Sequence, residues 1–418
     1  MNIVLHDAGT NDYLTRMYWE PLCSFMPQIK RVKSTDGIRD SLVIAHGDCL
    51  TPERILRLKN DGNKVCSFDI NDSSYLSKAY ARLPAQQEID LIFKVSGVPK
   101  RNEIAETSID GNFKILTSRE KFLPDDQWAE FEKLRPRIKP LPYVLWHPLT
   151  PPQAPVVPFE QRSGKVLLRG GNHFWRVILA FRLMQDGLLD ERSEFATAAR
   201  FTPEMEQRFQ FCDACKSEKG ERGCTPYEPE SRPEGCTSPV SKWGQDGSFF
   251  GGPVFGKQEF GKWNNCCPRS YLWLARQFEA RRGPLNAEFL EKLFNGDMRQ
   301  TEDFAQDLGS ASFAGDFKWL NTINLPPRFW EAASLGTPSL YAARTADQDY
   351  WPHVEAGVHY ATFSEDMLKF DIRGIRSNIW SDMSRAVKDL YETKIRGTDH
   401  SISNALLRYM AENIENIL

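Results

Sequence analysis

The feature that most constrains this chain is a series of short, almost wholly apolar segments, each followed by a turn rich in glycine and acidic residues. Residues 41–46 read SLVIAH, residues 64–68 read KVCSF, and residues 88–95 read EIDLIFKV. A strand that is apolar at consecutive positions is buried on both faces, which is typical of parallel sheets covered by helices. We therefore expect residues 1–147 to form an open, Rossmann-like α/β domain.

A helix signal follows the segment at 41–46, as the crossover between two parallel strands requires. Thr51 and Pro52 supply an N-cap residue and a proline at the first helical position. Further strands are expected at residues 2–6, 114–117 and 141–146.

A proline-rich stretch separates this half from the rest of the chain. Residues 148–158 contain five prolines, so residues 148–164 are predicted to be a stiff interdomain linker. A second α/β domain is expected over residues 165–370, opening with a strand at 165–169 and closing with a strand at 339–342. Within it, residues 211–268 are rich in cysteine, glycine and proline and are predicted to be an insertion.

The tail, residues 371–418, is expected to be helical. Apolar residues recur there at spacings of three and four, which is the helical period. They are Leu406, Leu407, Met410, Ile414 and Ile417.

Charge and hydropathy exclude some classes of protein. The formal net charge of −3 does not favour a chain that binds nucleic acid or anionic membrane over its whole surface. No apolar run approaches the roughly 20 residues of a membrane span, and the first residues, MNIVLHDAG, lack the basic region of a signal peptide. We therefore expect a soluble, cytoplasmic protein without a membrane span.

Cysteines supply a separate signal within the insertion. Cys212, Cys215, Cys224 and Cys236 begin with a C-x-x-C pair and could hold Zn²⁺ tetrahedrally. Such a zinc would be structural, because four thiolates leave no open position for substrate. The later pair lacks C-x-x-C spacing, so disulfides in an oxidising compartment and unligated thiols remain alternatives.

The most informative motif is at residues 327–338, which read PRFWEAASLGTP and predict a short helix ending at Gly336 before a strand. Together with Gly357–Tyr360 and Ser364–Asp366 further along, this segment resembles the nucleotide-sugar domain of group-1-like glycosyltransferases of the GT-B fold. The resemblance covers about fifty residues. It implies two Rossmann-like domains that face each other across a cleft, with C-terminal helices that cross back to the first domain.

The same resemblance implies a nucleotide diphosphate sugar as donor, with a UDP-sugar favoured. A carboxylate at Glu331 can accept hydrogen bonds from both ribose hydroxyls, and Arg328 can meet the diphosphate. Gly336 permits the turn that ends the helix, and Thr337 follows it in the motif. An amphipathic helix with a solvated glutamate is the plain structural alternative.

A second donor contact is expected where residues 167–176 read LLRGGNHFWR. Gly170 and Gly171 lie between a strand and a helix start, where backbone N–H groups can face phosphate oxygens. Arg176 would add charge-assisted hydrogen bonds. A tight connection without a ligand is the alternative.

Acceptor contacts and a general base are expected in the first domain, because ligands of open α/β sheets lie beyond the carboxyl ends of the strands. Polar residues there are His6, Asp7, His46, Asp48, Asp69 and Lys94. Asp7 and Asp48, and then His46, are the predicted bases for an inverting transfer. Helix capping by each aspartate is the structural alternative. Because Asp69–Asp72 is a poor match to an Asp-x-Asp metal pair, metal-independent chemistry is expected.

These patterns predict a hexosyl- or pentosyltransferase that moves a sugar from a nucleotide diphosphate sugar to a hydroxyl acceptor. A glycan, a small molecule and a hydroxylated DNA base all fit as acceptors, the last less favoured by the acidic balance. The alternative is a catalytically inactive GT-B-like binding protein whose zinc-stabilised insertion docks a protein or nucleic acid.

Overall fold

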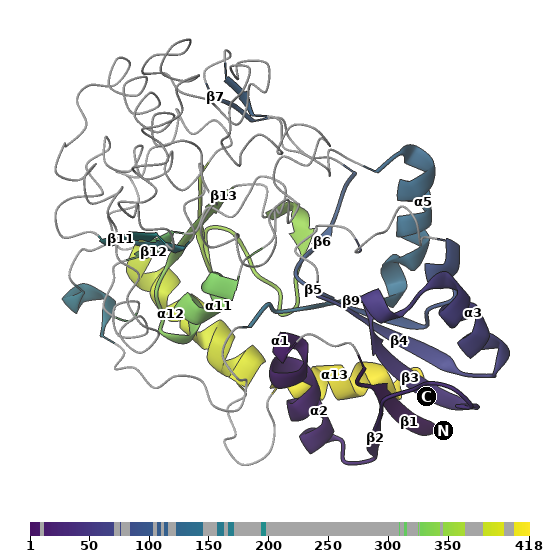
Figure 1. Cartoon of the computed structure of the whole chain (residues 1–418). Helices are drawn as coiled ribbons and strands as arrows, with labels where there is room; N and C mark the ends of the chain where they lie inside the picture. The colour runs from purple at the N-terminus through teal and green to yellow at the C-terminus, as the bar shows by residue number, and fades with distance from the viewer. Residues whose placement is uncertain are drawn as a thin grey trace, which may run out of the picture.

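The computed structural model describes two parallel sheets with their helices and connections. The described residues are 1–8, 12–70, 76, 84–102, 107–109, 113–115, 123–144, 157–162, 166–170, 194–197, 309, 313–315, 325, 327–342, 346–363, 379–396 and 405–418. Figure 1 shows the first sheet with its helices in purple and blue, and the second sheet beside it with green and yellow helices.

The first sheet has six strands, and every neighbouring pair is parallel. In spatial order the strands are β2 (Ile29–Val32), β1 (Asn2–His6), β3 (Ser41–His46), β4 (Lys64–Asp69), β5 (Leu91–Val95) and β9 (Ile138–Leu141). The α/β class and the parallel sheet expected from the apolar segments are thus confirmed.

Side chains along these strands point alternately to the two faces of the sheet. Both faces are covered by a core, which explains why the strands are apolar throughout. In β3, Leu42 and Ile44 join one hydrophobic core, whereas Val43 and Ala45 join a second core on the opposite face. Successive side chains of a strand point to opposite faces, so both faces need apolar residues when helices cover both.

Helices cover both faces of this sheet. Ile55 and Leu58 of α3 and Phe131 of α5 contribute to one core, and Trp19 and Leu22 contribute to the other. The elements are α1 (Asp12–Leu14), a π-helical turn (Thr15–Trp19), α2 (Glu20–Phe25), a 3₁₀ turn (Gly47–Cys49), α3 (Pro52–Asn60), α5 (Asp125–Leu134) and a 3₁₀ turn (Arg135–Arg137). Thr51 caps α3 as predicted, since its hydroxyl accepts a hydrogen bond from the Arg54 N–H at 3.3 Å.

Several strand predictions for this half need correction. β2 does not follow from the apolar pattern, because its Lys30 and Arg31 interrupt that pattern and β2 lies at an edge of the sheet. The strand expected at 141–146 is wrong in its bounds: β9 ends at Leu141 and contains Pro140, and residues 142–144 are not in a strand. A proline has no N–H to donate to a ladder, but β9 is the other edge strand, where proline is tolerated. The strand expected at 114–117 is β8, which pairs with β7 in an antiparallel hairpin outside the main sheet.

The second sheet has five strands, again parallel at every pairing. In spatial order they are β11 (Glu194–Thr197), β10 (Val166–Gly170), β12 (Phe313–Gly315), β13 (Ser339–Ala342) and β15 (Ala361–Phe363). The remaining elements are β6 (Val98–Pro99), β7 (Thr107–Ile109), β8 (Phe113–Ile115), a 3₁₀ turn (Phe159–Gln161), α11 (Pro327–Ser334), β14 (Gln348–Asp349), α12 (Ile379–Tyr391), a π-helical turn (Glu392–Arg396) and α13 (Ala405–Glu415).

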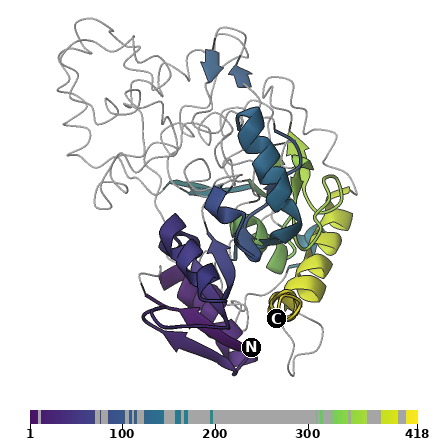
Figure 2. The ribbon, with the colours of Figure 1, turned by 90° about the vertical axis from the view of Figure 1, so that its right-hand side faces the viewer.

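The last helix returns to the first sheet. α13 packs against α2, and its Leu407, Met410 and Ile414 lie in the same core as Leu22 and Met26. Figures 1 and 2 both show the two chain ends lying close together at the first sheet. The apolar spacing predicted for the tail is therefore confirmed as the buried face of a helix.

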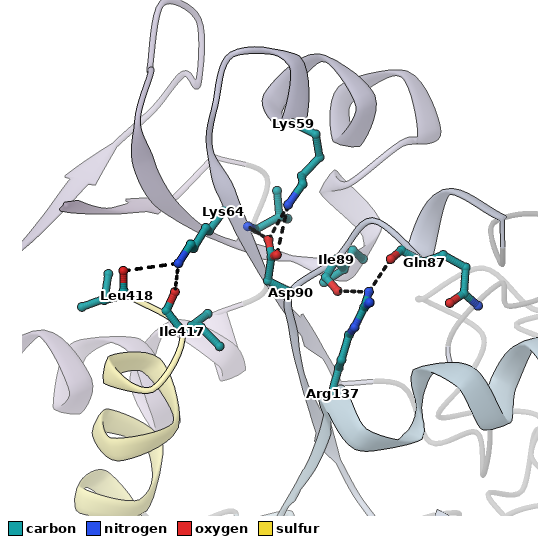
Figure 3. A network of polar contacts seen from close by, with 9 residues as sticks. Lys59, Lys64, Gln87, Ile89, Asp90, Arg137, Ile417 and Leu418 are labelled. Atoms are coloured by element: carbon teal, nitrogen blue, oxygen red, sulfur yellow. Dashed lines mark hydrogen bonds and ion pairs between the residues drawn. The ribbon is translucent and has the colours of Figure 1, made fainter.

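A polar network fixes the end of that helix (Figure 3). The Lys64 ammonium donates hydrogen bonds to the backbone carbonyls of Ile417 at 2.6 Å and Leu418 at 3.3 Å. Nearby, the Asp90 carboxylate accepts from Lys59 and from the Val65 N–H, which holds the amino ends of β4 and β5 together.

Two segments far apart in the sequence also join the halves. β6, just after β5, pairs antiparallel with β14, which follows β13. Within the described residues, no helix is long and apolar enough to cross a bilayer.

Truncation of Met410 tests the contribution of α13. Because this side chain is fully buried, we expect Met410→Ala to lower the free energy of unfolding by about 2–5 kcal/mol. Glu412→Ala, at an exposed position of the same helix, is the matched control and should stay within about 0.5 kcal/mol of wild type. Urea unfolding measures both, and equal effects would contradict the packing role of α13.

Candidate functional site

Strand order marks one point in each sheet where a ligand can approach the backbone. In the first sheet the chain proceeds from β1 outward to β2, and then resumes on the other side of β1 with β3. The second sheet repeats this order, with β10 and β12 as the pair between which the direction changes. Ligands of open α/β sheets bind beyond the carboxyl ends of such strand pairs.

Two histidines end the strands at this point of the first sheet. His6 ends β1 and His46 ends β3, and each side chain is buried. In the register of the sheet His6 lies opposite Ala45, so the two histidines are one residue out of step. Gly47, the residue after His46, lies close to the neighbouring strand β4. A Cβ at this position would lie 3.3 Å from the Phe68 carbonyl oxygen.

Asp7, the first predicted base, takes part in an ion-pair cluster. Arg31 donates to its Oδ2 through Nε at 3.1 Å and Nη2 at 2.6 Å, and the Lys33 ammonium lies 3.2 Å from the same oxygen. Burial by itself would raise the pKa of the Asp7 carboxyl, but the hydrogen bonds from Arg31 and Lys33 outweigh it and the net shift is downward. A lowered pKa makes Asp7 a weaker proton acceptor near neutral pH.

The pKa of His6 is lowered as well. Burial lowers the pKa of its imidazole, and the nearby Arg54 guanidinium lowers it further, against a backbone hydrogen bond at Lys33. A lowered pKa favours the neutral imidazole, which can accept a proton, and it also makes His6 a weaker base. Its Nδ1 is enclosed and has no hydrogen-bond partner among the described residues.

The other polar residues of this edge differ in exposure. Asp48 is exposed on the 3₁₀ turn after β3, whereas Asp69 and Lys94 are buried at the ends of β4 and β5. The Lys94 ammonium lies 3.9 Å from Asp69 Oδ1. The structure thus brings His6, Asp7 and His46 to neighbouring strand ends, with Asp48 at the rim.

In the second sheet, α11 lies between β12 and β13 in the chain, and it carries both residues of the predicted donor pair. Arg328 is the second residue of the helix and Glu331 the fifth. The Glu331 side chain is only 6% exposed, and its Oε2 lies 2.8 Å from Arg328 Nη1. A buried carboxylate requires a cationic partner such as Arg328. A polar ligand that replaces one member of this pair therefore changes the energy of the member that remains.

Aromatic packing fixes the orientation of α11. Phe329 lies edge-on to Trp330, Tyr341 and Tyr360, with ring centroids 4.8, 6.0 and 6.1 Å apart. Because Phe329 and Trp330 are buried in the core, their neighbours on the helix are held at defined positions.

Gly336 and Thr337, both predicted donor contacts, lie at the opposite end of α11. Gly336 has a φ of +64°, and its carbonyl accepts a hydrogen bond from Ser384 of α12 at 2.5 Å. Thr337 is completely buried and its hydroxyl accepts from Arg162 at 3.0 Å. These contacts tie the helix to its neighbours, so we leave both residues out of the proposed donor site.

Arg162, in the predicted linker, anchors this end of the helix. It also donates to the carbonyls of Leu335 at 3.1 Å and Val157 at 3.0 Å. Burial lowers the pKa of the Arg162 guanidinium to about 10, with Glu160 acting in the opposite direction, so it stays charged at neutral pH. Sequence reasoning missed this residue, because no local pattern distinguishes it within the linker.

Other predicted site residues can be placed only in part. Gly170 ends β10 at the change of direction in the second sheet, as a phosphate contact would require. The other predicted phosphate contacts and the predicted metal ligands, Gly171, Arg176, Cys212, Cys215, Cys224 and Cys236, lie outside the described residues. The zinc prediction therefore stays a prediction.

The downstream part of the motif forms a compact turn before β15. The Glu355 N–H donates to His359 Nδ1 at 2.9 Å, and Gly357 has a φ of +84°. Burial lowers the pKa of the His359 imidazole, against the hydrogen bond at Glu355. Residues 364–366 lie outside the described part of the chain.

Comparison with known proteins gives weak likenesses among solved structures. No family model and no curated protein matches the chain. The accessory secretory protein 1, 2 and 3 structure of Streptococcus pneumoniae has a TM-score of 0.38 at 9% identity, covering 92% of this chain and 55% of that one. This chain thus spans about half the length of that structure.

Two further structures are similar at the same level. The α,α-trehalose-phosphate synthase (UDP-forming) of Burkholderia vietnamiensis has a TM-score of 0.38 at 8% identity, covering 91% of this chain and 73% of that one. Anabaena Alr3699/HepE, in complex with UDP and glucose, has a TM-score of 0.36 at 10% identity and full coverage of both chains. TM-scores below 0.5 do not establish a shared fold, so the functional proposal depends on this chain's own topology and residues.

The lowered pKa of His6 predicts a pH dependence of stability. On acidification the unfolded chain binds a proton near the usual imidazole pKa of about 6.5, before the folded chain does. The free energy of unfolding should therefore fall as the pH drops below about 6.5, by at most about 1.4 kcal/mol per pH unit for one site. His6→Gln should make this fall shallower.

Urea unfolding between about pH 7 and pH 5 measures the effect. His359→Gln removes a second imidazole whose pKa is lowered and should flatten the profile separately. An unchanged slope in His6→Gln would show that the folded protein does not disfavour protonation of His6.

Proposed function

We propose that this chain is a glycosyltransferase that moves a sugar from a nucleotide diphosphate sugar to a hydroxyl acceptor. The observation that carries the proposal is the ion pair between the buried Glu331 and Arg328, on the helix that lies between β12 and β13 in the chain. A carboxylate and a guanidinium are suited to ribose hydroxyls and phosphate oxygens respectively.

On the donor side, we propose that Glu331 accepts hydrogen bonds from the ribose and that Arg328 turns toward the diphosphate. Gly170, with Gly171 and Arg176 beyond it, would complete the phosphate site. Charge on the departing diphosphate would be stabilised by these cations and by backbone N–H groups, without a metal ion. UDP is the proposed nucleotide.

On the acceptor side, we propose that the hydroxyl binds at the ends of β1 and β3. His6, His46, Asp7 and Asp48 are the groups there that could accept its proton or orient it. The ion pairs of Asp7 favour an orienting role for that residue, and an imidazole at the strand ends, His6 or His46, is the proposed proton acceptor. A glycan, a small molecule and a hydroxylated DNA base all remain acceptors to be tested.

We further propose the domain division that the sequence predicts, with an acceptor domain at 1–147 and a donor domain at 165–370 on opposite sides of a cleft. The two parallel sheets and the return of α13 support this division. A structural zinc in the insertion is part of the same proposal and would contribute to folding only.

The donor site is tested by nucleotide-dependent thermal unfolding. Uridine, guanosine and adenosine diphosphates and their sugars are added to wild type, to Glu331→Gln and to Glu392→Gln. A ligand at about 100 times its Kd should add roughly 2.7 kcal/mol to the stability of wild type. Loss of the charged acceptor in Glu331→Gln should weaken binding by about ten-fold or more, equivalent to ~1.5–3 kcal/mol.

Glu392→Gln is the matched control, because it breaks a Glu–Arg pair with Arg396 in a helical turn elsewhere. It should bind nucleotide as wild type does. If no nucleotide stabilises wild type, or if Glu331→Gln binds as tightly as wild type, the donor site is not at Glu331. Binding of a nucleotide sugar without transfer or hydrolysis would instead favour the inactive binding protein.

A further inference from the structure

Among the described residues, two of the contacts between the halves of the molecule differ in chemistry. One is the apolar packing of α13 on α2, in which Leu22, Leu407, Met410 and Ile414 are each at most 2% exposed. The other is the β6–β14 ladder, which has only two residue pairs and is surrounded by charged side chains. Apolar burial is insensitive to salt, whereas partly exposed ion pairs are screened by it.

Three cations of the first half meet two carboxylates of the second at this ladder. Arg101 lies 2.9 Å from Asp347, and Arg135 lies 3.3 Å from Asp349. Lys100 lies 3.9 Å from Asp349. We name this set, Lys100, Arg101 and Arg135 with Asp347 and Asp349, the ionic clasp.

Backbone contacts determine the register of the clasp. The Lys100 N–H donates to the Asp347 carbonyl at 2.8 Å, and the Lys100 ammonium donates to the Ala346 carbonyl at 3.2 Å. Arg135 also donates to the Pro99 carbonyl and pairs with Glu132 of α5. These contacts hold its guanidinium in place.

The chain leaves β5 in a conformation that serves the clasp. Ser96 has a φ of +136°, which is rare for a residue with a side chain and stores strain. Gly97 follows, and a Cβ there would lie 2.5 Å from the ring of Tyr350. The Tyr350 hydroxyl in turn accepts from the Leu325 N–H at 3.1 Å, so the ring is fixed against Gly97.

Both partners of the clasp lie just beyond the carboxyl ends of their strands. β6 follows the end of β5, and residues 346–350 follow β13. The clasp therefore links segments that follow the carboxyl edges of the two sheets. These are the edges at which ligands of such sheets bind.

We propose that the ionic clasp is a releasable interdomain latch and that the α13–α2 packing is the permanent attachment about which the halves open. The clasp side chains are partly exposed, with Arg135 at 26%, Asp347 at 34%, Lys100 at 47%, Arg101 at 51% and Asp349 at 53%. Their ion pairs can therefore be screened by salt, while the apolar attachment persists. The inference does not depend on the nucleotide, and it holds or fails whether or not Glu331 binds a donor.

Small-angle scattering of the full chain without ligand tests the latch. Wild type should increase in radius of gyration between about 0.1 M salt, where the Debye length is ~10 Å, and about 1 M, where it is ~3 Å. Asp347→Arg combined with Asp349→Arg should have the larger radius at both salt concentrations, because repulsion replaces attraction. Glu392→Lys, which disrupts an exposed pair outside the clasp, should behave as wild type.

The charge swap Arg101→Asp with Asp347→Arg restores one pair in reverse and should return the radius toward the wild-type value at low salt. If the double arginine variant does not fold, Asp347→Asn with Asp349→Asn is used instead, because asparagine removes the charge and keeps the shape of the aspartate side chain. A radius that is independent of salt in wild type, or a swap that leaves the molecule expanded, overturns the proposal.

Discussion

The arrangement of the two halves depends on the return of the last helix to the first sheet. α13 buries its apolar face against α2, in a core that also contains Phe329 and Tyr341 of the second half. One continuous set of buried side chains therefore spans both sheets. Lys64 secures the end of the chain by donating to the Ile417 carbonyl.

α11 is anchored by hydrogen bonds at its C-terminal end and carries an ion pair between Arg328 and Glu331. Arg162 and Ser384 satisfy carbonyls at its C-terminal end, where cations are favourable. Phe329 and Trp330 fix its rotation in the core. Arg328, the second residue of α11, and Glu331, the fifth, form an ion pair there. The rigidity of the anchored end is what gives the other end a defined geometry.

Much of the fold could be predicted because burial on both faces leaves a local record. The segments around Leu42, Cys66 and Phe93 are apolar at consecutive positions, and all three lie in central strands. The edge strands escaped prediction for the same physical reason: an edge has one paired side only, so Lys30 and Arg31 in β2 and Pro140 in β9 are tolerated. The helical tail was predictable from spacing, but its packing partner was not.

The sequence by itself determined the parallel α/β class, the buried face of α13 and the motif that contains Arg328 and Glu331, because each depends on neighbours within a few residues. Only the tertiary structure decided which partners the charged residues have. It placed Arg31 and Lys33 on Asp7, Arg162 on Thr337 and Arg101 on Asp347. Such pairs join distant parts of the chain, and the energy of a charge depends on burial and on partners that only folding brings near.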